Sequence, residues 1–315
     1  MYGNPEPTFI AIYKTVDGLP IPLDVYLPTP SSDNAPPIVV YIHSGCLVAN
    51  DSSDLPRYLP VFCERDNYVL VSVNFRQVPQ VKFGDCLRDV KDALTWCETT
   101  LPTLIKERGR SVDSGKVAVI GASSGAWLAL LVGAELFPNV KVVVAMYPMT
   151  NVTDESFRQP GPVPPTTLDD VREYIDGPTV AGSIPETDHS VFPPPITTGR
   201  ARAVAYLAQE ALWTQWLFGV EPNERAELDK WDARKLVTAK WPPTAVLHGD
   251  IDMLVQSSNG AQMAAALADA GVQSMYRSVR GANHFFDIVL DPKDEATLEA
   301  HSITEMWRFV AENLS

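Results

Sequence analysis

Short, wholly apolar segments recur along this chain of 315 residues, and stretches with helical periodicity separate them. A strand that is apolar without alternation is buried on both faces, as in a parallel sheet covered by helices. The pattern therefore predicts an α/β fold with a mainly parallel central sheet flanked by helices. The segments expected to form these buried strands are residues 37–42, 68–73, 116–120, 141–146 and 244–252.

Further elements are expected on either side of this pattern. Residues 8–16 and 19–26 are predicted to form two strands joined by the turn Asp17-Gly18, and residues 273–279 a last strand. Three helices are also indicated, one by residues 126–137, which are apolar nearly all round. The other two carry apolar stripes at Leu87, Val90, Leu94 and Cys97, and at Leu298, Ile303, Met306 and Val310.

The alternation of strands and helices stops between residues 150 and 241. This stretch is rich in proline and holds helical segments at 168–175, 203–218 and 225–236. A chain of this length suits one large domain plus an insertion. We therefore expect a core formed by residues 1–150 and 241–315, with residues 151–240 inserted into it.

Residues 121–125 read Gly-Ala-Ser-Ser-Gly and match G-x-S-x-G between an expected strand and an expected helix. A serine at such a sharp turn is held in a strained conformation that exposes its hydroxyl, and the glycines avoid collisions with neighbouring backbone. The start of the helix offers free N–H groups to developing negative charge. We predict that Ser123 is a nucleophile. The neighbouring Ser124 does not suit this role, because it does not lie midway between the two glycines of the pattern. Isolated matches also occur in ordinary loops.

A nucleophilic serine needs a base, and the base needs a carboxylate that holds it in one tautomer. Of the five histidines, only His284 follows the last expected strand in a short loop that contains glycine. We predict that His284 is the general base, the alternative being a histidine of a surface loop. Two candidates for the acid, Asp250 and Asp252, lie just past the strand that begins at residue 244.

Acyl transfer also needs hydrogen-bond donors that face the oxyanion. The backbone N–H of Ser124 is expected to be one donor, and those of Gly45 and Cys46, after the strand at 37–42, are expected to be the others. His43 at the start of this loop is expected to brace it rather than take part in the chemistry. The Cys46 thiol is a further candidate nucleophile, although no strand-to-helix turn surrounds it.

Together these segments resemble the hormone-sensitive-lipase-like branch of the α/β-hydrolases. Residues 43–46 (H-S-G-C) stand where that branch has H-G-G-G, residues 74–80 (N-F-R-Q-V-P-Q) resemble its Y-R-L-A-P-E, and residues 248–252 resemble the superfamily pattern H-G-x-x-D. The resemblance implies an α/β-hydrolase fold and a serine esterase of the carboxylesterase type.

The same resemblance assigns roles to particular residues. It implies the triad Ser123, Asp252 and His284, with Asp250 fixing the loop, and it makes residues 151–240 a lid over the active site. The chain departs from the pattern in Ala122, where an aspartate is usual, in Gln80, where a glutamate is usual, and in two glycines of the oxyanion loop. These departures fit a specialised enzyme that acts on one metabolite.

The expected lid contains several large apolar side chains. Such side chains either line a substrate pocket or form the core of the lid itself, and the sequence leaves both alternatives open. The candidates for lining the pocket are Tyr206, Trp213, Trp216, Leu217 and Phe218, with Phe192 a weaker one.

Charge and composition narrow the classes of partner. The net charge of −14 argues against binding to nucleic acid or to anionic membranes. No segment has the features of a leader or a membrane span, so a cytoplasmic protein with reduced thiols is expected. The four cysteines have no metal-site spacing and no cofactor motif is present, so no cofactor and no metal are expected. The oligomeric state, a homodimer included, is left open.

Three functions compete for this sequence. The first is hydrolysis of a small to medium carboxylic ester, including thioester, lactone or amide variants, through an acyl-enzyme. The second keeps the fold but performs cyclisation, C–C cleavage or acyl transfer in a biosynthetic pathway, and the altered oxyanion loop motivates it. The third is a ligand receptor without catalysis, against which an intact triad argues.

Overall fold

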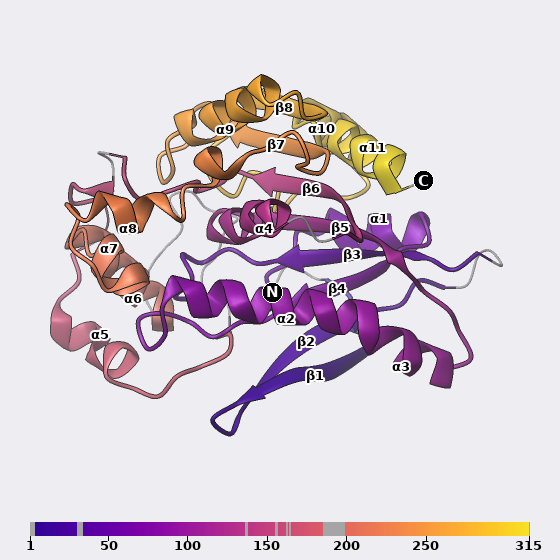
Figure 1. Cartoon of the computed structure of the whole chain (residues 1–315), viewed down its shortest axis with the longest axis horizontal. Helices are drawn as coiled ribbons and strands as arrows, with labels where there is room; N and C mark the ends of the chain where they lie inside the picture. The colour runs from indigo at the N-terminus through magenta and orange to yellow at the C-terminus, as the bar shows by residue number, and fades with distance from the viewer. Residues whose placement is uncertain are drawn as a thin grey trace.

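The computed structural model describes residues 4–29, 34–135, 138–154, 157–161, 163, 165–184 and 199–314. In these residues an eight-stranded sheet forms the centre, in the order β1-β2-β4-β3-β5-β6-β7-β8 (Figure 1). Its strands are β1 (Phe9–Val16), β2 (Leu19–Tyr26), β3 (Pro37–Ile42), β4 (Val69–Val73), β5 (Asp113–Ala122), β6 (Val140–Met146), β7 (Thr244–Gly249) and β8 (Ser274–Val279).

Only β2 runs in the direction opposite to the other strands of the sheet. β1 pairs with β2 and β2 with β4 in antiparallel fashion, whereas the pairs from β4 through β3 to β8 are parallel. Asp17 and Gly18 have φ of 50° and 82°, the left-handed conformations that a tight hairpin turn uses. The expected α/β fold with its mainly parallel sheet is confirmed.

Helices cover both faces of the sheet. Successive side chains of each buried strand point to opposite faces, so both faces are apolar and need a cover. In β3, Val40 and Ile42 belong to the core beneath α2 (Phe83–Thr99), α4 (Ser124–Ala134) and α9 (Ser258–Asp269). Val39 and Tyr41 belong to the opposite core, beneath α1 (Tyr58–Arg65) and α11 (Ile303–Leu314). The remaining core helices are α3 (Leu101–Glu107) and α10 (Glu295–Ala300).

Several expected helices have other limits in the structure. The helix expected at 203–218 is two helices, α6 (Gly199–Gln209) and α7 (Trp213–Phe218), because Ala211 adopts a left-handed conformation with φ of 52°. The C-terminal helix is likewise divided at Ser302, whose φ is 60°. α4 ends at Ala134, and Phe137, the expected end, lies outside the described residues.

The described part of residues 151–240 contributes no strand to the sheet. Its elements are α5 (Leu168–Ile175), α6, α7, α8 (Arg225–Asp229) and the short 3₁₀ helix η2 (Ala233–Leu236). The four α-helices gather beyond the carboxyl ends of the parallel strands, at the left of Figure 1. Among the described helices, none combines the length and the apolar character that crossing a lipid bilayer requires.

One buried arginine ties this helical region to the core. Arg200 of α6 donates to the carbonyl oxygens of Val48 at 2.6 Å and Val78 at 2.7 Å, and to the Gln80 side chain at 3.2 Å. Burial lowers the pKa of Arg200 to about 10. Because Val48 follows the expected oxyanion loop directly, Arg200 joins α6 to that loop.

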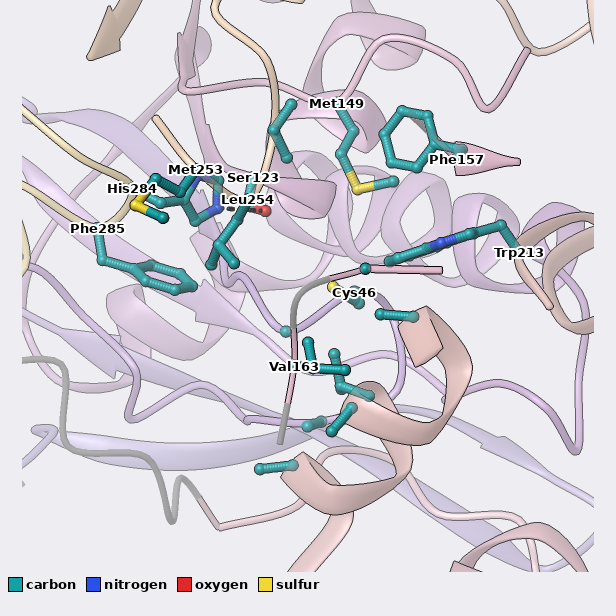
Figure 2. A pocket seen from close by; sticks show the side chains of 18 of the residues that line it. Cys46, Ser123, Met149, Phe157, Val163, Trp213, Met253, Leu254, His284 and Phe285 are labelled. Atoms are coloured by element: carbon teal, nitrogen blue, oxygen red, sulfur yellow. Dashed lines mark hydrogen bonds between the residues drawn. The ribbon is translucent and has the colours of Figure 1, made fainter. Parts of the chain in front are cut away.

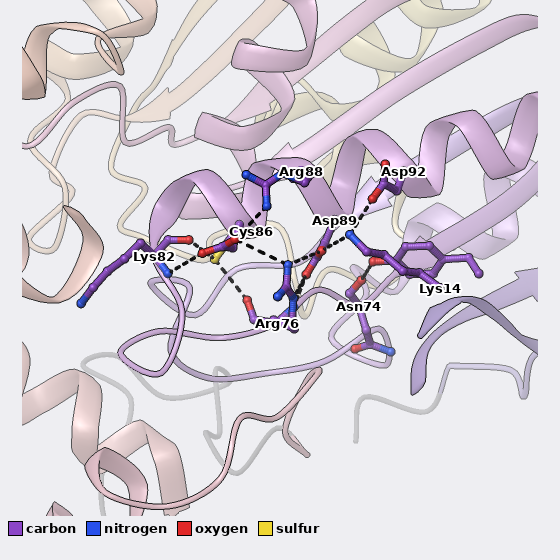
Figure 3. Close-up of polar contacts among 10 residues, drawn as sticks. Lys14, Asn74, Arg76, Lys82, Cys86, Arg88, Asp89 and Asp92 are labelled. Carbon is purple, nitrogen blue, oxygen red and sulfur yellow. Dashed lines mark hydrogen bonds and ion pairs between the residues drawn. The ribbon is translucent and has the colours of Figure 1, made fainter. Parts of the chain in front are cut away.

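A buried ion cluster holds residues 74–80 in place (Figure 3). Arg76 donates to Asp89 of α2 through two nitrogens, at 2.8 and 2.9 Å, and Lys14 of β1 donates to the same carboxylate at 2.7 Å. The Asp89 side chain is fully buried, so its charge needs both cations. Arg76 thus joins residues 74–80 to α2, Lys14 joins the strand hairpin to the same carboxylate, and Arg76 does not line the cavity described next.

Candidate active site

Ser123 lies between β5 and α4 in a backbone conformation rare for serine, with φ of 54° and ψ of −118°. Both neighbouring glycines are required by close contacts with backbone. A Cβ atom at Gly121 would lie 2.3 Å from the carbonyl oxygen of Gly125, and one at Gly125 would lie 2.3 Å from those of Ile42 and His43. The G-x-S-x-G pattern is therefore a steric requirement of this turn.

His284 stands between Ser123 and Asp252. Its Nε2 lies 3.0 Å from Ser123 Oγ, and its Nδ1 lies 2.6 Å from Asp252 Oδ2. With the ring proton on Nδ1 and donated to the carboxylate, Nε2 is free to accept the serine proton. The structure thus brings together the three residues that the sequence predicts.

Asp252 is held as a carboxylate. Its side chain is fully buried, which opposes ionisation, yet the charge of His284 and hydrogen bonds from His248, His284 and the Val255 N–H keep its pKa well below the usual range. Asp250 is exposed and accepts a hydrogen bond from the Gly281 N–H at 2.6 Å. Of the two candidates, Asp252 therefore contacts His284, and Asp250 fixes the loop.

Three backbone N–H groups are candidates for an oxyanion hole, two in the loop after β3 and one, that of Ser124, at the start of α4. Gly45 and Cys46 have φ of 106° and 58°, and a Cβ at Gly45 would lie 2.2 Å from the Ala49 carbonyl oxygen. Among the described residues, no acceptor contacts the N–H groups of Gly45, Cys46 or Ser124. Both loop residues border the same cavity as Ser123.

A polar cluster that the sequence analysis missed supports this loop. Ser44 Oγ donates to Asp54 at 2.9 Å, and Asn50 Nδ2 donates to Asp54 at 2.7 Å and to Ser44 Oγ at 3.2 Å. The serine that replaces the first glycine of H-G-G-G is therefore part of the support. His43 donates from Nδ1 to the Ser44 carbonyl at 2.7 Å and stacks on Phe75, and burial lowers its pKa.

The Cys46 side chain is poorly suited to nucleophilic attack. Burial raises the pKa of its thiol to about 12, so it is protonated at neutral pH. His284, the predicted base, is hydrogen-bonded to Ser123 instead.

A buried carboxyl also lies close to the ring of His284. Asp287 accepts from Tyr147 at 2.7 Å and from Tyr58 at 3.0 Å, and the Tyr147 ring centroid lies 4.6 Å from that of His284. Burial raises the pKa of Asp287. Sequence patterns do not identify Asp287, Tyr147 and Tyr58, because these residues are not neighbours in the chain and match no motif.

Ser123 and His284 open into a cavity of about 290 Å³ (Figure 2). Apart from His284, its lining among the described residues contains no histidine and no charged side chain. The apolar walls come from both the core and the inserted region. Their largest members are Met149, Phe157, Trp213, Met253, Leu254 and Phe285.

Only one of the five expected pocket residues lies on this wall. Trp213 lines the cavity and packs edge-on against Phe157, with ring centroids 5.3 Å apart. Trp216 and Leu217 are buried, Tyr206 packs against Trp216, and Phe218 packs among Phe83, Trp127 and Trp231. These four, Tyr206 of α6 and the three α7 residues, do not line the cavity as predicted, because their side chains pack within the interior instead. Phe192 lies outside the described residues.

Nothing in the described ranges brings three or more histidine, cysteine or acidic side chains together as a metal site requires.

Comparison with known proteins agrees with this description. The family model described as BD-FAE matches residues 23–162, and that of the prolyl oligopeptidase family matches residues 201–315. The chain is 28% identical to the non-reducing polyketide synthase ascC of Acremonium egyptiacum and 27% identical to stbA of Stachybotrys bisbyi, over 90% and 91% of its length. It spans only 14% of the length of each of these relatives.

Solved structures show the same fold. An α/β hydrolase superfamily protein from Enterococcus faecalis aligns with a TM-score of 0.67 and 16% identity over 91% of this chain and 94% of its own. The Pyrobaculum calidifontis esterase aligns with a TM-score of 0.64 and 23% identity over 97% and 88%. As the resemblance of its motifs predicts, the chain has the α/β-hydrolase fold.

Proposed function

We propose that this chain is a serine hydrolase that cleaves a carboxylic ester or thioester through an acyl-enzyme. The observation that carries the proposal is the continuous hydrogen-bonded chain from Ser123 through His284 to the buried Asp252. Three backbone N–H groups near the serine, which have no acceptor among the described residues, support it, because an oxyanion needs such donors where negative charge develops.

In the first half of the reaction, Ser123 Oγ attacks the acyl carbonyl while His284 Nε2 takes its proton. The carbonyl oxygen becomes an oxyanion that the N–H groups of Gly45, Cys46 and Ser124 stabilise. Asp252 stabilises the imidazolium that forms. His284 then returns the proton to the departing alcohol or thiol, and the acyl group stays on Ser123.

In the second half, a water molecule or a second alcohol gives its proton to His284 and attacks the acyl-enzyme. Collapse of the second oxyanion breaks the bond to Ser123, which regains its proton from His284. The fate of the acyl group therefore depends on which acceptor reaches the ester.

The cavity supports a small, uncharged and largely apolar acyl group. Its volume of about 290 Å³ is at the lower end of the range for small-molecule sites. Met149, Phe157 and Trp213 offer apolar and aromatic surface, and no charged lining residue among those described would pair with a charged substrate.

We further propose that residues 151–240 form the lid. Ala201, Val204 and Trp213 of α6 and α7 line the cavity that Ser123 and His284 enter from the core. A cover of this kind excludes water while the acyl-enzyme forms and shapes the pocket for its substrate.

A second candidate function is acyl transfer in a biosynthetic pathway. The similarity to non-reducing polyketide synthases over about nine-tenths of the chain favours it. On this alternative the acyl group is a polyketide, and the acceptor is an alcohol or an internal nucleophile rather than water.

One experiment separates the two candidates. Aryl and alkyl thioesters and esters of matched size are supplied with and without a small alcohol, and the products are identified by mass spectrometry. Free acid as the main product at every alcohol concentration supports hydrolysis. Transfer or cyclised products that outnumber free acid support the second candidate. Absence of turnover, together with absence of Ser123 acylation, contradicts both.

A further inference from the structure

His248, the first residue of the H-G-x-x-D motif, lies in β7 directly beside the triad acid. Its side chain is fully buried, and its Nε2 lies 3.1 Å from Asp252 Oδ2 and 3.0 Å from the Val255 carbonyl oxygen. Asp252 Oδ2 is the same oxygen that contacts His284 Nδ1 at 2.6 Å. Two imidazole rings therefore meet at one carboxylate oxygen.

The other oxygen of Asp252 also accepts two hydrogen bonds. Oδ1 accepts from the N–H groups of Leu254 and Val255, each at 2.9 Å. With two donors on each oxygen, the carboxylate cannot rotate about its Cβ–Cγ bond without breaking several hydrogen bonds at once. His248 is the only side chain besides His284 that contacts this carboxylate among the described residues.

The structure also determines which nitrogen of His248 carries the proton. Nδ1 is buried and has no hydrogen-bond partner in the described part of the chain. It faces the start of α9, where a Cβ atom at Gly260 would lie 2.7 Å away. A proton on Nδ1 would be a buried donor without an acceptor, whereas a proton on Nε2 has two acceptors.

We propose that His248 is a positioning residue for the reaction, and this inference rests on the proposed acyl-enzyme function. Its Nε2–H fixes the plane of the Asp252 carboxylate, and that plane directs His284 Nε2 toward Ser123 Oγ. His248 itself contacts neither the serine nor the cavity. Its loss therefore affects the rate of acylation and leaves binding of the substrate unchanged.

The experiment uses two amide substitutions of His248 that differ in where they place an N–H. The side-chain nitrogen of glutamine occupies the position of Nε2, and that of asparagine the position of Nδ1. We expect His248→Gln to retain most of the parent kcat, and His248→Asn to lose about 10- to 100-fold with KM unchanged. The rate of reaction of Ser123 with a fluorophosphonate should fall in parallel. Equal effects of the two substitutions, or an effect confined to KM, would overturn the proposal.

A variant that leaves His248 intact tests the same point if His248→Asn does not fold. Gly260→Ala adds a methyl group 2.7 Å from Nδ1 and displaces the ring toward Asp252. We expect a lower kcat with unchanged KM, whereas Ala261→Ser on the exposed side of α9 should change neither. An unchanged kcat in folded Gly260→Ala would contradict the inference.

Measurements on the parent protein distinguish a failure of the proposed function from a failure of the role proposed for His248. A parent that neither reacts with the fluorophosphonate nor turns over any ester or thioester refutes the proposed function and this inference with it. A reactive parent whose His248→Gln and His248→Asn variants behave alike refutes the inference alone.

Discussion

At the scale of single residues, the site separates two aspartates that lie only two positions apart. Asp252 contacts His284 at 2.6 Å inside the protein, whereas Asp250 is exposed and bonds to the backbone at Gly281. Both follow the same strand, so sequence spacing alone leaves both as candidates. The difference arises because the chain reverses after β7 and turns one side chain inward and the other outward.

This difference gives a matched pair of variants. Asp252→Asn should lower kcat by about 10⁴-fold, because an amide no longer holds His284 in the required tautomer. Asp250→Asn should stay close to the parent, since the Asn side-chain oxygen can still accept from Gly281. Steady-state kinetics on the best substrate checks both, and equal losses would undo the assignment of the acid.

The buried carboxyl of Asp287 predicts a dependence of stability on pH. Because burial raises its pKa in the folded protein, its contribution to stability is complete below the ordinary carboxyl pKa of about 4 and is lost as pH rises through the raised value. The Asp287→Asn variant has no such group. The free energy of unfolding of the variant minus that of the parent should therefore increase with pH. Urea denaturation from pH 4 to pH 8 measures it, and a constant difference would contradict this reading of Asp287.

At the scale of elements, the strand-to-helix turn at Ser123 depends on the absence of two side chains. Gly121→Ala in β5 places a methyl group against backbone atoms of α4 and should cost about 1–3 kcal/mol or more of stability. Gly115→Ala in the same strand contacts only the Asp113 side chain and is the control, expected within about 0.5 kcal/mol. Similar melting temperatures for the two variants would show that the turn can relax.

Arg200 gives a second prediction at this scale, on how α6 is held. Arg200→Met leaves the carbonyl oxygens of Val48 and Val78 without this donor, at about 1–3 kcal/mol for each buried group. Arg202 of the same helix pairs with Asp170 near the surface, so Arg202→Met should cost less than about 1 kcal/mol. Denaturant unfolding compares the stability of the two variants. Equal losses of stability would contradict the role of Arg200 in holding α6 to the core.

At the scale of the whole molecule, the inserted region and the core share the cavity. Trp213→Ala should raise KM for aryl substrates and leave fluorophosphonate labelling intact, because Trp213 lines the wall but does not contact the triad. Phe218→Ala removes a side chain packed among Phe83, Trp127 and Trp231, and should lower stability without a comparable change in KM. The reverse pattern would show that the pocket lies elsewhere.

The sequence predicts the core of this molecule well because the core depends on local patterns. Uninterrupted apolar strands and the G-x-S-x-G turn are set by neighbours in the chain, and the strands from 37 to 146 lie close to their expected positions. Helix α1 was not predicted, since Pro60 and a nearly continuous apolar stretch from Tyr58 to Cys63 obscure its periodicity. Support for the site from Asp54, Asp287 and His248 could not be predicted, because it depends on contacts between distant segments or on a tautomer.

The proposed function depends above all on Ser123 being an activated nucleophile. The most direct test is intact-mass analysis after treatment with a fluorophosphonate, on the parent and on the Ser123→Ala and His284→Ala variants. We expect one adduct on the parent, located at Ser123, none on Ser123→Ala, and labelling slowed by several orders of magnitude on His284→Ala. An unlabelled parent, or an adduct that persists in Ser123→Ala, would contradict it.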